Sequence, residues 1–517
     1  MKTRKELEQI AKLGINLLKK EKGLLEGLVY VNSNKITIGR LVFTTHIPSS
    51  GLEEPKTSEE IGVAVEIWFE KNGKKLLGSG YEAGELSLSA IKRALIKAKR
   101  NAVEDREFYG FLKPQDIKNR NRIAKKFAPN KAELSKQEEA SFLARISWDT
   151  IKGSIDGLDE YKKFKKKSLN DLAFILNGDN FLMQEKMAVA TTDGIFESDE
   201  TSSVSSLMTA MFEKENAKGS SWDAKLLTED FSGYEVGKKA ALAAANSIGG
   251  VRIGGGKYTV VFGHQAVTEL FGSLLLLHAN LAMIDFGASM FVGKYGQMVA
   301  SPLLTLYDDA TLPGGAGSKA ITCEGYPTGK TLLIKDGKLV GYLSDSRTTN
   351  KILNKKKGAR KLFGVDPHEI RHAINPQNGF RFIDNTVRTA STGIGIHASN
   401  LIVDSSKLVS EEKLLRSVKN GIFIGRLWYT YPIGGYISGI ITGTAVADCY
   451  TIKNGRMKDP ILPNTLRLED NIGKMVKDII GIANNKIPTV LWSSDALVYA
   501  PWVAMKNVNF IEIGTSK

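Results

Sequence analysis

Apolar residues recur along this chain with two spacings, and each spacing predicts one type of element. The most informative stretch begins with an apolar run at 258–262, which predicts a strand that ends before Gly263. The residues after it are apolar at spacings of three and four, which predicts a buried helix: Val267, Leu270, Phe271, Leu274 and Leu277. The first turns of this helix carry His264 and Glu269, a histidine and a carboxylate where a strand passes into a helix.

The first half of the chain alternates helical and strand-like patterns. Helical spacing predicts these helices: 3–20, 87–103, 134–151 and 232–248. Apolar runs predict these strands: 27–32, 35–45, 61–70 and two or three more within 185–213. Ser135 and Glu138 predict a capping box, and Thr192-Asp193-Gly194 predicts a hairpin turn. This order of elements predicts an α+β domain over 1–240, with helices on an antiparallel sheet.

The second half is rich in glycine and in strand-like runs. Two hairpins are predicted with two-residue turns, one at Asp336-Gly337 and one at Asn454-Gly455. We therefore expect a second, β-rich domain over 241–517.

Composition and charge narrow the class of protein. The net charge of +15 comes mostly from lysine clusters at 19–22, 162–167 and 355–361, which have few aromatic residues among them. We expect an exposed lysine-rich surface and no nucleic-acid partner. Apolar runs are shorter than the roughly 20 residues that span a bilayer, so we expect no membrane partner and a cytoplasmic location. Cys323 and Cys449 lie too far apart to indicate a cysteine zinc site or a disulfide framework.

Three segments of the second half resemble the TldD/PmbA family of metallopeptidases. They are DFGASMFVGKYGQMVAS, LYDDATLPGGAGSKAITCEGYPTGKTLLIKDGKLVGYLSDS and ISGIITGTAVADCYTIKNGRMKDPI, and with their spacing they cover most of 235–515. The resemblance implies an α+β N-terminal domain and a β-rich, barrel-like C-terminal domain. It also implies a dimer that cleaves unfolded peptides, in which a TldD-type zinc subunit pairs with a PmbA-type (TldE) subunit that lacks zinc.

The family's HExxxH signature falls on 264–269, where only the first histidine is present. Gln265 replaces the glutamate that acts as general base, and an amide has no useful basicity for that role. Glu269 replaces the second histidine. His264 and Glu269 are both zinc-ligand types, but residues five apart in a regular helix point about 140° apart, so joint ligation needs a π-bulge or an unwound turn.

The family's cysteine ligand is also missing. Residues 491–517 contain no cysteine, and Asp495 is the carboxylate near the position where that cysteine is expected. Two interpretations stay open. Either the motif is a silent remnant, with His264 a buried hydrogen-bonded residue, or His264 and Glu269 form a variant metal site.

A rival motif, HExxH, lies at 368–372. On a helix it would place His368 and His372 on one face as zinc ligands, with Glu369 as catalytic base. Asp366 and Pro367 could begin such a helix, whereas Arg371 would put a cation beside the metal. The alternative is a short exposed helix whose residues match the HExxH pattern by chance.

Other polar residues are weaker candidates. Asp308, Asp309 and Glu324 lie in turn-like sequence that matches a structural segment of the family, and Cys323 stands where relatives often carry an acid. The glycines at 314, 315 and 317 lack the Lys-Ser/Thr of a phosphate loop.

These observations lead to three hypotheses. In the first, the chain is a PmbA (TldE)-like subunit of a zinc-dependent complex that cleaves unfolded peptides, and zinc comes from a TldD-type partner. In the second, it is a self-sufficient metallopeptidase, alone or as a homodimer, that uses His264 and Glu269, or His368 and His372 with Glu369. In the third, it binds peptides without catalysis. The residues leave open whether this chain is itself an enzyme.

Overall fold

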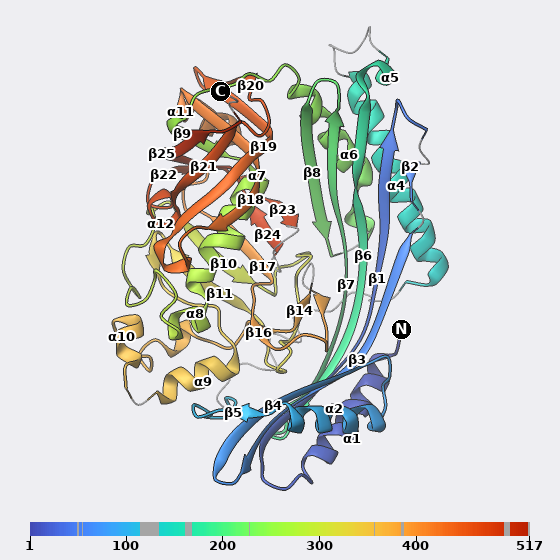
Figure 1. Ribbon diagram of the computed structural model, residues 1–517, viewed down its shortest axis with the longest axis vertical. Coiled ribbons are helices and arrows are strands. Elements are labelled where there is room, and N and C mark those ends of the chain that lie inside the picture. Colours follow the sequence, from blue (N-terminus) through green and yellow to red (C-terminus); the bar gives the residue numbers. More distant parts are fainter. Residues whose placement is uncertain are drawn as a thin grey trace.

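The computed structural model describes these residues: 1–48, 51–53, 55–113, 134–160, 168–226, 228–355, 357–383, 387–490 and 497–514. Within them, three large sheets organise the molecule (Figure 1). A long curved sheet runs along one side, and a barrel and a mixed sheet lie beside it. No helix in these stretches is long and apolar enough to cross a bilayer. The lysine cluster at 162–167 lies outside the described residues.

The curved sheet is antiparallel, as predicted. Its strand order is β5-β4-β3-β1-β6-β7-β8, and β2 pairs with β1 at one end. The bounds are β1 (Leu24–Thr44), β2 (Gly51–Leu52), β3 (Lys56–Lys71), β4 (Lys74–Ala83), β5 (Val103–Glu104), β6 (Phe174–Thr191), β7 (Phe196–Phe212) and β8 (Ala217–Lys225). The hairpin predicted at 192–194 joins β6 to β7.

Strand β1 corrects one prediction, because runs 27–32 and 35–45 form a single strand of 21 residues. The polar residues between them are buried in the sheet rather than placed in a turn. Asn32 Oδ1 accepts the Ala390 N–H at 3.0 Å, and Asn34 Nδ2 donates to the Arg388 carbonyl at 2.6 Å. A loop from the second half of the chain therefore satisfies polar groups that looked like a strand break.

Helices cover the curved sheet at both ends (Figure 1). They are α1 (Arg4–Leu18), α2 (Leu88–Arg100), α4 (Lys136–Glu160), the short α5 (Leu169–Leu172) and η3 (Thr228–Asp230), and α6 (Gly233–Asn246). The predicted capping box of α4 is confirmed, since Ser135 Oγ accepts the Glu138 N–H at 3.2 Å and Glu138 accepts the Ser135 N–H at 2.7 Å. Apolar faces of α1 and α2 pack at one end of the sheet, and those of α4 and α6 at the other.

The second half contains a sheet that closes into a barrel, which confirms the barrel-like expectation. Strands β9, β25, β21, β19 and β18 pair in this order, and β18 pairs again with β9. β20 and β22 extend it. The bounds are β9 (Gly256–Phe262), β18 (Gly421–Pro432), β19 (Ile440–Lys453), β20 (Arg456–Pro460), β21 (Leu466–Asn471), β22 (Ile479–Ile482) and β25 (Val503–Glu512).

A mixed sheet of order β12-β11-β10-β17-β24-β23 packs beside the barrel. Its strands are β10 (Thr305–Asp309), β11 (Lys330–Lys335), β12 (Lys338–Leu339), β17 (Asn400–Asp404), β23 (Ile487–Val490) and β24 (Leu497–Ala500). Two ribbons complete the described strands: β13 (Gly379–Phe380) with β16 (Gly395–Ile396), and β14 (Phe382–Ile383) with β15 (Val387–Arg388). Both predicted two-residue hairpins form, and Asp336 and Gly337 have the positive φ values, 46° and 81°, that such a turn requires.

Short helices fill the spaces between these sheets. They are α7 (His264–Thr268), η4 (Glu269–Leu275), η5 (Leu276–Ala279), α8 (Leu281–Asp285), α9 (Ser346–Asn354), α10 (Ala359–Phe363), η6 (Arg371–Ala373), α11 (Glu411–Val418), η7 (Tyr436–Ser438) and α12 (Ile472–Met475). The predicted helix after Gly263 is therefore three successive turns of different pitch, and η4 is π-helical. Its apolar face lies in the largest apolar core of the molecule.

A buried ionic network joins the curved sheet to the second half. Arg388, fully buried, contacts Glu185 of β6 at 2.7 Å and Asp199 of β7 at 2.9 Å. Lys319 reaches the same Glu185 at 2.8 Å. Burial alone would raise the pKa of Glu185, but Arg388 and Lys319 hold it below its usual value. Each charge in the network is therefore matched across the two halves.

Candidate functional site

The strand β9 and the helix α7 meet at Gly263, and the close packing there requires glycine. A Cβ at this position would lie 2.9 Å from the Phe423 ring and 3.0 Å from the Gly425 Cα. Real Cβ atoms avoid such distances, so β18 can approach the turn only because residue 263 has no side chain. This contact fixes the direction in which α7 begins and so the position of His264.

His264 has both ring nitrogens engaged. Nδ1 lies 2.7 Å from the Ala500 carbonyl, which can only accept, so Nδ1 carries the hydrogen. Nε2 lies 3.5 Å from Glu411 Oε1. Burial alone would raise the pKa of Glu411, but its hydrogen bonds to His264 and Asn485 hold that pKa below the usual value. The ring is thus held between a carbonyl and a carboxylate.

His264 lines a cleft of about 640 Å³ between the curved sheet and the barrel. One wall comes from β8 and α6, and the other comes from β18, β19 and β20. Aromatic rings shape it: Trp222, Phe423, Tyr450 and Trp502. Polar side chains line it as well, among them Lys239, Asn246 and Lys458. A cleft of this size that combines aromatic walls with placed polar groups is typical of ligand-binding sites.

Asp448 also lines this cleft, and no local sequence pattern marks it as a site residue. It is half-buried, with a left-handed backbone (φ 53°), and Oδ2 accepts the Ser220 N–H at 3.2 Å. Oδ1 is buried without a hydrogen-bond partner. Burial raises the pKa of Asp448 to about 7, against the opposing effects of Ser220 and Arg426. A left-handed aspartate in a strand is visible only in the structure.

Glu269 points away from this cleft. Gln265 Nε2 donates to Glu269 Oε1 at 3.0 Å and to the Leu427 carbonyl at 3.1 Å, and Gln265 Oε1 accepts the Leu427 N–H at 2.9 Å. Glu269 lines a different cavity, of about 210 Å³, beside Trp428 and Tyr429. Burial raises the pKa of Glu269 to about 7, although Gln265 and Arg426 oppose the rise.

The side chains around α7 do not fit a zinc ion. A zinc site needs at least three protein ligands of the His, Cys or carboxylate type. Across the described ranges, no three such residues are grouped so that they could hold a metal ion. The π-helical stretch that joint ligation would require is present, but it starts at Glu269 and does not bring that carboxylate to His264. Asp495 lies outside the described residues.

The HExxH residues lie elsewhere, and the helix predicted for them is wrong. Residues 367–370 form a turn, followed by the 3₁₀ turn η6. Asp366 Oδ1 accepts the His368 N–H at 2.9 Å as a helix N-cap would, but no α-helix follows it. His368, Glu369 and His372 are all exposed, and His372 Nε2 lies 3.3 Å from the Tyr295 hydroxyl. The two histidines do not share a helical face.

The comparison with known families now decides the relationship. Residues 255–512 match the family described as "PmbA/TldA metallopeptidase C-terminal domain". The chain belongs to the TldD/PmbA metallopeptidase family. This stretch contains the barrel, the mixed sheet and α7, so the family match covers one wall of the cleft and His264.

Curated relatives support the TldD/PmbA assignment. The chain is 29% identical over 191 residues to a metalloprotease TldD homologue of Haemophilus influenzae, covering 35% of this chain and 31% of that protein. It is 26% identical over 222 residues to a metalloprotease of Synechocystis, covering 42% and 40%. The alignments thus span less than half of either relative.

The fold as a whole is similar to a solved TldD/PmbA protein. The structure of TldE from Thermococcus kodakarensis superposes with a TM-score of 0.72, at 17% identity, covering 98% of this chain and all of that one. At this identity the likeness shows the fold alone.

Asp308 and Asp309 of the family segment are structural by their contacts. Asp308 is buried and accepts hydrogen bonds from the Ser399 N–H at 2.8 Å and from Asn378 Nδ2 at 2.7 Å. Burial raises the pKa of Asp308 to about 7, and these hydrogen bonds oppose the rise. Asp309 instead accepts the Thr311 N–H in a turn, and Cys323 Sγ accepts the Arg381 N–H. Asp308 and Asp309 are adjacent in sequence, but their carboxylates have different partners and do not form one site.

Proposed function

We propose that this chain is a PmbA (TldE)-like subunit of a metal-dependent peptidase complex that cleaves unfolded peptides. It contributes the substrate cleft, and a TldD-type partner contributes zinc. The supporting observation is the divergence of His264 and Glu269 into two separate cavities, with an amide at the general-base position between them. Such a set can bind and orient a peptide, but it lacks the second histidine and the glutamate base of the family motif.

The cleft suits an extended peptide. Strand β8 is the last strand on its side of the curved sheet, and its residues 220–222 form part of the cleft wall. Extended peptides bind by adding to such strands, because backbone groups give affinity whatever the sequence. The aromatic rings then supply apolar contact for alternate side chains.

A hairpin without charged residues is a second observation that supports the proposal of a partner subunit. No charged residue occurs from 427 to 447, and the tip of β18 and β19 exposes large apolar side chains. They are Trp428, Tyr429, Tyr431, Ile433, Tyr436, Ile437 and Ile440. Tyr429 is 72% exposed and Ile437 61%. Exposed aromatic clusters without charge are typical of protein interface cores.

Metal content and reconstitution test the proposal together. The purified chain is expected to hold no stoichiometric zinc and to leave denatured casein intact. It is expected to increase the activity of a TldD-type subunit with an intact HExxxH motif when the two are mixed. His46→Ala serves as a matched control, because His46 pairs with Glu213 away from the cleft.

Two results would overturn it. Near-stoichiometric zinc that is lost in His264→Ala, or in His368→Ala/His372→Ala, would identify a self-sufficient metallopeptidase. Metal-free protein that binds casein but changes no partner's activity would identify a peptide-binding protein that has lost any part in catalysis.

A further inference from the structure

A third cavity, of about 270 Å³, shares no lining residue with the cleft. It is enclosed by β3, α8, α9 and β16 together with one connecting segment. We name it the carboxyl pocket, because the carboxyl groups of Glu66, Asp285, Glu324 and Asp345 line it. Since one water occupies about 30 Å³ of liquid, it has room for a small organic group.

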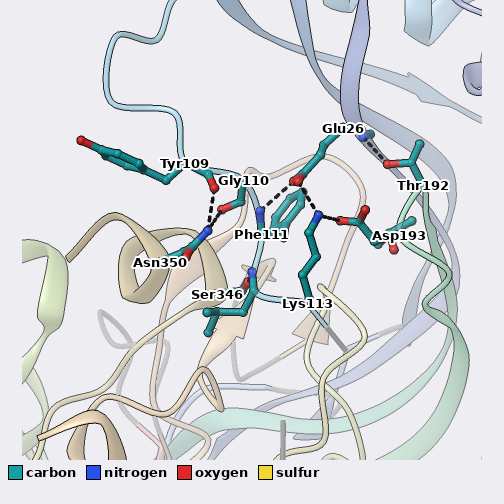
Figure 2. Close-up of polar contacts among 12 residues, drawn as sticks. Glu26, Tyr109, Gly110, Phe111, Lys113, Thr192, Asp193, Ser346 and Asn350 are labelled. Carbon is teal, nitrogen blue, oxygen red and sulfur yellow. Dashed lines mark hydrogen bonds and ion pairs between the residues drawn. The ribbon is translucent and has the colours of Figure 1, made fainter. Parts of the chain in front are cut away.

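The connecting segment, residues 105–113, forms one wall and is held firmly (Figure 2). Figure 2 shows Asn350 of α9 donating to the carbonyls of Tyr109 and Gly110, at 2.8 and 2.7 Å. The Phe111 N–H donates to Glu26 at 2.7 Å, and Lys113 reaches Glu26 and Asp193 at 2.9 Å each. The ring of Phe111, which lines the pocket, is therefore fixed from both sides.

The cations that line the carboxyl pocket already have partners. Lys351 lies 2.6 Å from Asp285, and Arg347 lies 3.0 Å from Asp105. Among the carboxylates, Asp285 also contacts Lys355, and Glu66 pairs with Arg381. Each lining cation is thus neutralised by a carboxylate, so the pocket offers no free positive charge to an anion.

Glu324 and Asp345 are the unmatched pair. Within the described ranges neither forms an ion pair, and they are 1% and 7% exposed. Glu324 Oε2 accepts the Ser346 N–H at 2.9 Å and Asp345 Oδ1 accepts the Thr348 N–H at 2.7 Å, so both cap α9. Glu324 Oε1 is buried without any hydrogen-bond partner. A buried carboxyl oxygen that lacks a donor is costly.

The pKa values of Glu324 and Asp345 also indicate that neighbouring donors and cations do not offset the burial of this pair. Burial raises the pKa of Glu324 well above its ordinary value, and the neighbouring Asp345 adds to the rise. Burial also raises the pKa of Asp345, although Thr348 and Arg347 oppose it. A cation between the two carboxyl groups would offset the cost of burying their charged forms and would reduce the repulsion between them.

We propose that the carboxyl pocket binds a primary ammonium group, which donates to Glu324 Oε1 beside Asp345. A metal ion fits less well, since no cluster of three ligating side chains occurs in the described ranges. A guanidinium prefers two free oxygens of one carboxylate, and Glu324 Oε2 is already occupied. A quaternary ammonium has no N–H for Oε1. Ile394 and Ile396 give the alkyl stem an apolar wall.

The test is a calorimetric titration of the whole chain with n-butylammonium chloride, with 1-butanol as the neutral isostere. We expect saturable binding of butylammonium in roughly the millimolar range and at least about tenfold weaker binding of butanol. Glu324→Gln and Asp345→Asn each keep an oxygen that can cap α9, and each is expected to weaken butylammonium binding about tenfold or more. Glu269→Gln, the same change at another buried glutamate, is expected to leave binding unchanged.

Three results would overturn the proposal: no saturable binding to the wild type, equal binding of butanol, or full binding by both pocket variants. Two further ligands distinguish the sources of the ammonium group. N-acetyl-lysine methylamide carries it on a side chain, and glycine methylamide carries it at a peptide N-terminus. Because the pocket is separate from the cleft, this test does not depend on the peptidase proposal.

Discussion

Gln265 shows how one side chain can fix the chemistry of a site. Its amide donates and accepts on the backbone of Leu427 and also holds Glu269. A glutamate at this position could not donate to the Leu427 carbonyl, so the hydrogen bonds between α7 and β18 depend on the amide. The residue that removes the general base from the motif is therefore also a structural link to the barrel.

The raised pKa of Glu269 leads to a prediction about pH. The pKa of the Glu269 carboxyl rises from 4.5 to about 7 on folding, so the folded protein holds this proton more tightly than the unfolded chain does. The folded state therefore loses stability as pH increases between those two values. We expect Glu269→Gln to unfold like the wild type at pH 4 and to be more stable at pH 8, by about 2–3 kcal/mol. Thermal unfolding across pH 4–8 measures this. Parallel curves for the two proteins would contradict it.

At the scale of elements, the turn between β9 and α7 positions the cleft. The helix after it changes pitch twice, from α to π to 3₁₀, while its apolar face stays in the core. Only the first turn carries cleft residues, so the angle at Gly263 decides where His264 points.

We expect Gly263→Ala to destabilise the protein by about 1–3 kcal/mol, because the added methyl group overpacks against β18. Gly254→Ala is the matched control, since a Cβ there meets nothing within 4 Å. Chemical denaturation of both variants measures the difference. Equal stability of the two variants would show that β18 moves freely and that the turn does not fix His264.

Local patterns in the sequence predicted most elements, and long-range contacts account for what they missed. The capping box at Ser135 and the Asp-Gly and Asn-Gly turns are local signals, and all formed. The break predicted within β1 failed because residues more than 350 positions away each form a hydrogen bond with Asn32 or Asn34. The helix at 368–372 did not form, although Asp366 accepts the His368 N–H as a helix N-cap would. Asp448 and the pair Glu324 and Asp345 become notable only through burial, which no local pattern reveals.

At the scale of the whole molecule, the network around Arg388 joins the two halves through buried charges. Removing Arg388 leaves Asp199 without its ion-pair partner and Glu185 with Lys319 alone, and losing a partner in a buried network is usually far costlier than losing a surface pair.

We therefore expect Arg388→Met to lower the free energy of unfolding by about 3–5 kcal/mol. Arg416→Met removes an exposed pair with Glu412 and is expected to change it by less than about 1 kcal/mol. Denaturant titration compares the two variants. A similar small effect for both would mean that the halves are held together by apolar packing alone.

The barrel also has a consequence for synthesis on the ribosome. Strand β9 precedes α7, yet its antiparallel neighbour is β25, about 250 residues later. Ala500, which holds His264, is equally late in the chain. The curved sheet can form while translation continues, whereas the cleft cannot assemble until residue 512 has left the exit tunnel. During that interval β9 can pair only with β18, its parallel neighbour, and the edge that β25 later covers stays exposed.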